Sequence, residues 1–201
     1  MEKRDIFRNT LLIFTSDHGE ELGEHNIYFE HGHNAYQSTM HVPLIMTYPG
    51  RIPEKKTVNR NLVLVDIFPT ILSYAGIQPP EQLEGRSLHT LIEGKNPADG
   101  PVFSEGGYLF ERNNRYHSVL YLNDYKLIHD RTGRWELYNL VNDPYEQQNL
   151  INKKPENAAL MKKMLLDWES KDIGISEQQT EGTEKLSKET VDQLRALGYV
   201  D

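Results

Sequence analysis

The residue types best suited to chemistry in this 201-residue chain gather between residues 16 and 33. Asp17 and His18 are adjacent, and His31 and His33 follow with only Gly32 between them. A carboxylate oxygen and an imidazole nitrogen can together bind a divalent cation. A further imidazole nearby can donate to an anionic oxygen or protonate a leaving group. The pattern is therefore compatible with one edge of a metal site.

Two adjacent ligands are only part of such a site, because calcium takes roughly six or more oxygens and zinc about four ligands. An Asp-His-Gly triplet is also more often a turn or a helix cap than a metal site. The nearby glutamates are most simply a solvated loop face: Glu20, Glu21 and Glu24. The other histidines are interpreted as surface or packing residues (His25, His89, His117, His129) or as support for the loop (His41). Spacing alone leaves the metal edge and the turn both open.

Two short apolar runs, residues 10–15 and 42–46, flank this loop. Continuous apolar runs of this length are typical of strands buried on both faces, as in a parallel sheet. Pro43 cannot donate to a ladder and is expected at the start of the second strand. The polar segment 16–40 is predicted to be a long loop, which in a compact domain is usually functional or disordered. Asp17 and His18 would then lie at the carboxyl end of a strand, where open α/β sheets bind ligands.

Residues 66–76 are predicted to form a helix that packs on the sheet, capped by Asp66, with Pro69 in its first turn and Gly76 at its end. Four aromatic and β-branched runs between 101 and 140 predict an antiparallel meander. A helix behind Pro155 should cover it with one apolar face: Leu160, Met161, Met164, Leu165 and Trp168. Residues 170–186 read as a linker, and Ser187 to Gly198 as a short helix. The predicted divisions are 1–98, 99–169 and 170–201.

Composition excludes several classes of function. The formal charge of −8 and the pI of about 5.5 argue against nucleic acid or an anionic membrane as a partner. The absence of cysteine excludes disulfides, thiolate metal sites and a cysteine nucleophile. No stretch approaches the roughly 18 apolar residues of a membrane span. The first residues lack the apolar run of a secretory signal, so the compartment is left open.

An ordered series of segments resembles the sulfatases of the alkaline phosphatase superfamily. Their pattern is a strand, Thr-Ser-Asp-His/Asn-Gly, Leu-Gly-Glu-His, a basic residue and Val-Pro-Leu-Ile. The chain matches it at residues 15–19, 22–25, 31 and 42–45. Further matches follow at residues 66–72, 85–88, 125–128, 136–140, 142–146, 149–150 and 194–200. No single motif identifies the family, but the whole series, in this order over roughly residues 8–200, is specific to it.

The resemblance implies an α/β fold: the C-terminal part of an alkaline-phosphatase-like mixed sheet, followed by a small antiparallel subdomain with a covering helix. It implies hydrolysis of a sulfuric ester, with a small-molecule or carbohydrate sulfate as substrate. Asp17 and His18 take the positions of metal ligands, usually for Ca²⁺, with Mg²⁺, Mn²⁺ and Zn²⁺ as alternatives. Asp17 would also help to deprotonate the nucleophile. His31, with His33 next, takes the place of the basic residue that contacts sulfate.

The family's nucleophile is a formylglycine made within a Cys/Ser-x-Pro-x-Arg motif. This chain has no cysteine and no Ser-x-Pro-x-Arg. We therefore expect a fragment whose N-terminal half, with the nucleophile and the other metal ligands, lies outside this sequence, and which is inactive alone. One alternative is a phosphodiesterase, phosphonate monoester hydrolase or phosphoglycerol transferase of the same superfamily. Another is a non-catalytic binding remnant that self-associates through exposed strand edges.

Overall fold

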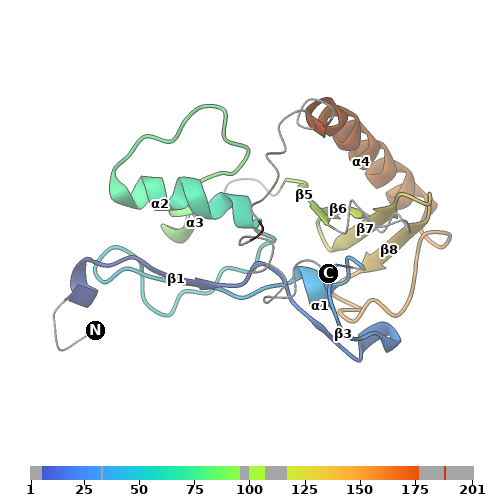
Figure 1. Ribbon diagram of the computed structural model, residues 1–201, viewed down its shortest axis with the longest axis horizontal. Coiled ribbons are helices and arrows are strands. Elements are labelled where there is room, and N and C mark those ends of the chain that lie inside the picture. The colour runs from blue at the N-terminus through green and yellow to red at the C-terminus, as the bar shows by residue number, and fades with distance from the viewer. Residues whose placement is uncertain (1–5, 33, 96–99, 107–116, 177–187, 189–201) are drawn as a thin grey trace. The chain divides into compact units, whose positions relative to one another are not determined.

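The computed structural model describes residues 6–32, 34–95, 100–106, 117–176 and 188. These residues form helices and antiparallel sheets (Figure 1), and the predicted α/β class is confirmed. The chain divides into two compact units, residues 1–165 and 166–201. The predicted boundary near 98 and the predicted terminal helix from Ser187 lie outside the described residues, so the domain limits remain a prediction. No helix in the described ranges has both the length and the apolar character to cross a membrane.

The predicted meander is present as a four-stranded antiparallel sheet in the order β5-β6-β7-β8 (Figure 1). Its strands are β5 (Val102–Gly106), β6 (His117–Leu122), β7 (Tyr125–Asp130) and β8 (Trp135–Asn139). The turn between β6 and β7 uses Asn123 at a positive φ of 52°. Side chains alternate across a strand, so each face of the sheet holds its own buried row. One row is Leu120, Leu127 and Leu137, and the other is Val119, Tyr121, Ile128 and Tyr138, packed with Ala35.

Helix α4 (Pro155–Ser176) begins where the proline predicts but is longer than expected. It continues through residues 170–176, which we predicted to be linker, and includes Gly174, which a helix tolerates at a cost of about 1 kcal/mol. Its buried side chains are Ala158, Met161 and Leu165. Leu160, predicted on that face, is 56% exposed, since it is rotated by about 100° from Met161. The Lys162 ammonium lies 4.9 Å from the centre of the Trp135 ring, which links α4 to β8.

The two strands that flank the candidate site are β1 (Leu12–Thr15) and β4 (Leu44–Thr47). Pro43 directly precedes β4, as predicted. The expectation of doubly buried, parallel strands is wrong, because β1 and β4 pair antiparallel as a two-stranded sheet. Leu12, Phe14 and Ile45 are 40%, 60% and 60% exposed. An apolar run shows that both faces suit burial, but it specifies neither the direction of the partner strand nor what covers it.

The segment between these strands is not the irregular loop that we predicted. It contains β2 (Glu21–Leu22) and β3 (Tyr28–Glu30), which pair as a short hairpin around the 3-10 turn η3 (Glu24–Asn26). A one-turn helix, α1 (Gln37–Met40), follows and packs against β2. Elements this short carry little periodicity, so polar composition alone led to the wrong interpretation.

After β4 the chain forms the 3-10 turn η4 (Leu64–Asp66) and helices α2 (Ile67–Ala75) and α3 (His89–Ile92), which lie against each other. Gly76 ends α2 in the left-handed region, at φ 73°, as predicted. Asp66 does not cap α2 with its side chain. Its buried carboxylate instead accepts the Arg86 N–H at 2.8 Å and so fixes the segment before α3.

A buried charge cluster connects the meander to α1. Lys126 on β7 is fully buried, and its ammonium donates to Glu146 Oε1 at 2.7 Å and to Gln37 Oε1 at 3.3 Å. The Tyr121 hydroxyl donates to the same Gln37 oxygen at 2.9 Å. Glu146 Oε2 in turn accepts the backbone N–H of Gln37 at 2.6 Å. Gln37 is therefore held by both its backbone and its side chain. Loss of solvent lowers the pKa of Lys126 to about 8, although the carboxylates of Glu146, Glu136 and Glu21 act in the opposite direction.

Replacing Thr70 by valine should lower the free energy of unfolding by about 1–3 kcal/mol. The fully buried Thr70 hydroxyl accepts the Leu88 N–H at 2.8 Å and donates to the Asp66 carbonyl at 2.6 Å. Valine keeps the shape but leaves the Leu88 N–H buried without an acceptor. Urea unfolding of the two chains measures the difference. Ser73→Ala is the matched control on the same helix, because the Ser73 hydroxyl only donates to Pro69. Equal losses in the two variants would contradict the prediction.

The contribution of Lys126 to stability should rise with pH between about 8 and 9.5. The folded chain releases the Lys126 proton near pH 8, whereas the unfolded chain keeps it to about 10.5. Unfolding in this window takes up a proton, so a higher pH disfavours unfolding, by at most about 1.4 kcal/mol per pH unit. The difference in unfolding free energy between the chain and Lys126→Met, measured in urea from pH 7 to 9.5, should therefore grow in favour of lysine. A difference that stays flat would mean that the carboxylates keep the ammonium charged.

Candidate active site

Asp17 lies two residues beyond the end of β1 and presents its carboxylate to solvent, with 81% of its side chain exposed. Asp17 Oδ1 accepts the His18 backbone N–H at 3.0 Å and the Ser16 hydroxyl at 3.3 Å. The His18 N–H is the main cause that lowers the pKa of Asp17 below its usual value. The carboxylate is therefore ionised at neutral pH, oriented by its own turn, and open on its Oδ2 side.

His18 adds a nitrogen donor next to that carboxylate. Its Nδ1 lies 2.8 Å from the Gly19 carbonyl, which can only accept, so this nitrogen carries the proton. Nε2 then holds a lone pair, and it lies 3.7 Å from Asp17 Oδ2. One cation can bridge donor atoms at this separation with bonds of about 2.0–2.5 Å. The pair fits part of a divalent-metal shell.

His31 lies beside this pair although it is 13 residues further along the chain. Its ring stacks on that of His18 with centroids 4.2 Å apart and planes inclined by 20°. Its Nδ1 is 3.1 Å from Glu20 Oε2, so the carboxylate orients the ring. Interpreting Glu20 as solvated loop face missed this contact. The structure thus brings together Asp17, His18 and His31, whereas His33 lies outside the described residues.

A tight approach between the site turn and α1 holds the turn in place. The Gly19 N–H donates to the Thr39 carbonyl at 2.8 Å. A Cβ at position 19 would lie 2.0 Å from the Ser38 carbonyl oxygen, a distance that no side chain tolerates. Glycine is therefore required there by close contact with α1. The turn that carries Asp17 and His18 takes its position from the helix.

Glu21, the other glutamate assigned to a solvated face, is fully buried, and both carboxylate oxygens are without a hydrogen-bond partner within the described structure. It belongs to β2, beside α1. A charged residue in a polar stretch gives no pattern that predicts burial, so sequence reasoning had no means of finding it. Glu24 is exposed as expected, and its carboxylate accepts the Leu22 N–H at 2.7 Å.

The remaining histidines lie in packing contacts or on the surface. His25 stacks on Tyr36 with centroids 3.7 Å apart, and His129 stacks on Trp135 at 3.8 Å. His89 meets the edge of Tyr74, with centroids 5.0 Å apart. His41 is exposed and ends α1 by donating its N–H to Gln37. In the described ranges, no three or more His, Cys, Asp or Glu side chains gather in a group that could hold a metal.

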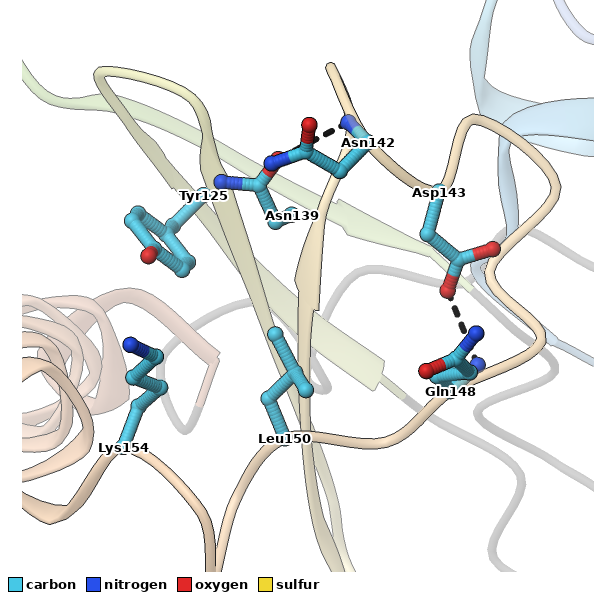
Figure 2. A pocket seen from close by; sticks show the side chains of 7 residues that line it. All are labelled: Tyr125, Asn139, Asn142, Asp143, Gln148, Leu150 and Lys154. Carbon is cyan, nitrogen blue, oxygen red and sulfur yellow. Dashed lines mark hydrogen bonds between the residues drawn. The ribbon is translucent and has the colours of Figure 1, made fainter.

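A pocket of about 230 Å³ lies elsewhere, between the end of β8, the segment that follows it and the start of α4 (Figure 2). Most of the residues that line it carry a polar group: Tyr125, Asn139, Asn142, Asp143, Gln148, Leu150 and Lys154. Asn139 accepts the Asn142 N–H at 2.9 Å, and Asp143 accepts the Gln148 N–H at 2.8 Å. These groups serve the local turns, and none of the predicted site residues lines the pocket.

Comparison with protein families places most of the chain in one of them. Residues 23–171 match the family of the N-sulphoglucosamine sulphohydrolase C-terminal domain. An N-acetylglucosamine-6-O-sulfatase of Bacteroides thetaiotaomicron is 33% identical over 160 residues, which are 76% of this chain and 28% of that protein. An arylsulfatase of Clostridium perfringens is 32% identical over 195 residues, 94% of this chain and 39% of that protein. The chain thus spans well under half the length of these relatives.

Solved structures agree with this placement. A protein solved in complex with its substrate D-glucosamine-2-N,6-O-disulfate matches with a TM-score of 0.72 and 29% identity, over 91% of this chain and 38% of that one. The phosphonate monoester hydrolase of Agrobacterium radiobacter matches with a TM-score of 0.72 and 25% identity, over 85% of this chain and 37% of that one. The chain therefore belongs to the sulfatase family, of which it represents the C-terminal portion.

Proposed function

We propose that this chain forms one wall of an active site that hydrolyses a sulfuric ester, and that it is inactive alone. The observation that carries the proposal is that Asp17 and His18 share one turn and that the His31 ring stacks on His18, in a chain from the sulfatase family. The chain has no cysteine and no Ser-x-Pro-x-Arg. A formylglycine nucleophile and the other metal ligands would come from polypeptide outside this sequence.

Asp17 and His18 would hold a divalent cation, most simply Ca²⁺, through Oδ2 and Nε2, the two donor atoms that the turn leaves open. When bound, the cation would neutralise negative charge on the sulfate group. The Asp17 carboxylate is ionised and exposed, so it can also accept a proton from a nucleophile that approaches it. Mg²⁺, Mn²⁺ and Zn²⁺ accept the same donor types, so the choice of Ca²⁺ rests on the family resemblance.

His31 would contact the sulfate or the oxygen of the leaving group. The His31 Nδ1 is hydrogen-bonded to the Glu20 carboxylate, so the other ring nitrogen, Nε2, would be the one to contact a substrate. An imidazole can pass a proton to a departing alcohol, which a charged lysine does less readily. A sulfated sugar is the substrate class that we favour, because one relative is named an N-acetylglucosamine-6-O-sulfatase and one matching structure holds a sulfated glucosamine.

A phosphonate monoester hydrolase is the second candidate, because one such enzyme matches the fold as well as the sulfated-sugar complex does. Sulfate and phosphonate esters present similar anionic oxygens to a cation and an imidazole. The better sequence identities, 33% and 32%, are to sulfatases, which favours the sulfuric ester.

The purified chain should not turn over 4-nitrophenyl sulfate above a metal-free blank, with or without 5 mM Ca²⁺, at roughly micromolar protein. The physical reason is that the chain contains no Cys/Ser-x-Pro-x-Arg motif from which the nucleophile could be made. Release of 4-nitrophenol measures the outcome, and 4-nitrophenyl phenylphosphonate run in parallel tests the second candidate. Turnover of the sulfate ester would overturn the claim of inactivity.

Calcium should bind the isolated chain only weakly, with a Kd of about 1 mM or above, because two protein ligands leave most of the shell to water. Chemical shifts of the His18 and Gly19 amides during a calcium titration report the binding. Asp17→Asn should abolish these shifts, whereas Glu84→Gln, which changes an exposed glutamate outside the site, should leave them unchanged. Micromolar affinity would reveal ligands in the chain that the proposal does not include.

A further inference from the structure

The fully buried side chain of Lys126 lies in the meander, yet its contacts lead towards the candidate site. The ammonium donates directly to the Gln37 side chain, and it reaches the Gln37 backbone N–H through the Glu146 carboxylate. Gln37 is the first residue of α1, and α1 holds the site turn through the Thr39 carbonyl. Hydrogen bonds, joined by the short stretch of α1 backbone between Gln37 and Thr39, therefore connect β7 to the turn.

Three hydrogen bonds make up the main path of this series. The Lys126–Glu146 contact is 2.7 Å, the Gln37 N–H lies 2.6 Å from Glu146, and the Gly19 N–H lies 2.8 Å from Thr39. Helix α1 has a single turn, so a displacement of Gln37 cannot be absorbed before it reaches Thr39. The approach of Ser38 to Gly19 passes any such displacement on to the turn.

Glu21, a second residue next to the site, also interacts electrostatically with Lys126. Glu21 on β2 is fully buried, and its carboxylate contributes to the electrostatic field at Lys126. A buried carboxylate is tolerated where a cation is near. The hairpin of β2 and β3 carries Glu21, and Glu20 and His31 lie directly at its two ends. The buried ammonium thus interacts with α1 through hydrogen bonds and with the β2–β3 hairpin through the charge of Glu21. These two segments place Asp17, His18 and His31.

We propose that Lys126 is a positioning residue for the candidate active site, acting through Glu146 and Gln37 on helix α1 and on the turn at Asp17-His18-Gly19. The chemical importance of that turn rests on the proposed function, but the placement of the turn does not. At pH 7 the ammonium is charged and orients two acceptors that come from distant parts of the chain. A neutral side chain of similar length would fill the space without directing Gln37.

The test compares local opening of the site turn in the full chain and its variants. Lys126→Met should speed hydrogen exchange of the Gly19 amide by about tenfold or more while the amides of Val119 and Leu127 stay protected. The K126M/E146Q double variant removes both charges together, avoids an unpaired buried carboxylate, and should show the same selective opening at Gly19. It serves as the measurement if Lys126→Met folds poorly.

Leu165→Ala is the matched control, because Leu165 is equally buried but lies on α4 and has no part in the series. A merely structural role of Lys126 would make Gly19 exchange follow global stability, as in Leu165→Ala. That outcome, at matched unfolding free energy, would overturn the proposal. His18 imidazole shifts, recorded in the same samples, should move in the Lys126 variants and not in the control. No metal or substrate is added, so failure of the proposed function would leave this result intact.

Discussion

The buried ion pair between Lys126 and Glu146 is the contact on which the arrangement of the candidate site depends. Burying both charges costs about as much as their attraction returns, so such pairs add little net stability. The lowered pKa of Lys126 agrees with that balance. What the pair provides is orientation: Lys126 and Glu146 each hydrogen-bond Gln37, and together they allow only one placement of that residue. Tyr121 and the backbone of Gln37 complete the same network.

A second polar network supports the first from the neighbouring strand. The Tyr36 hydroxyl donates to Glu136 at 3.0 Å, the Tyr138 hydroxyl donates to the same oxygen, and Arg134 pairs with the other oxygen at 2.7 Å. Burial is the largest cause that raises the pKa of Tyr36 to about 12, so the hydroxyl stays a donor across the physiological range. Tyr36 precedes Gln37 in sequence, and the meander therefore holds two consecutive residues at the start of α1. The site turn is therefore positioned by the four-stranded sheet, through α1.

The sequence predicted those parts of the fold that depend on local patterns. The meander follows from alternating apolar residues and tight turns, and α2 ends at Gly76 because only a left-handed residue closes it there. The pairing of β1 with β4 was not predictable, because an apolar run carries no information on strand direction. Likewise Lys126 and Glu21 are charged residues whose burial depends on contacts far away in sequence. Asp17, His18 and His31 were predicted as site residues from chemistry and resemblance, whereas the contact of Glu20 with His31 became visible only in the folded hairpin.

The contacts that place Gln37 also constrain the order of events during folding. Lys126 lies 89 residues from Gln37, and Glu146 lies 109 residues from it. Closing such long loops carries an entropic cost that local hairpins avoid. We therefore expect β6, β7 and β8 to form first, and α1 to dock on them afterwards. On a ribosome, the turn at Asp17 is synthesised before the meander and waits for more than a hundred further residues before it reaches its final geometry.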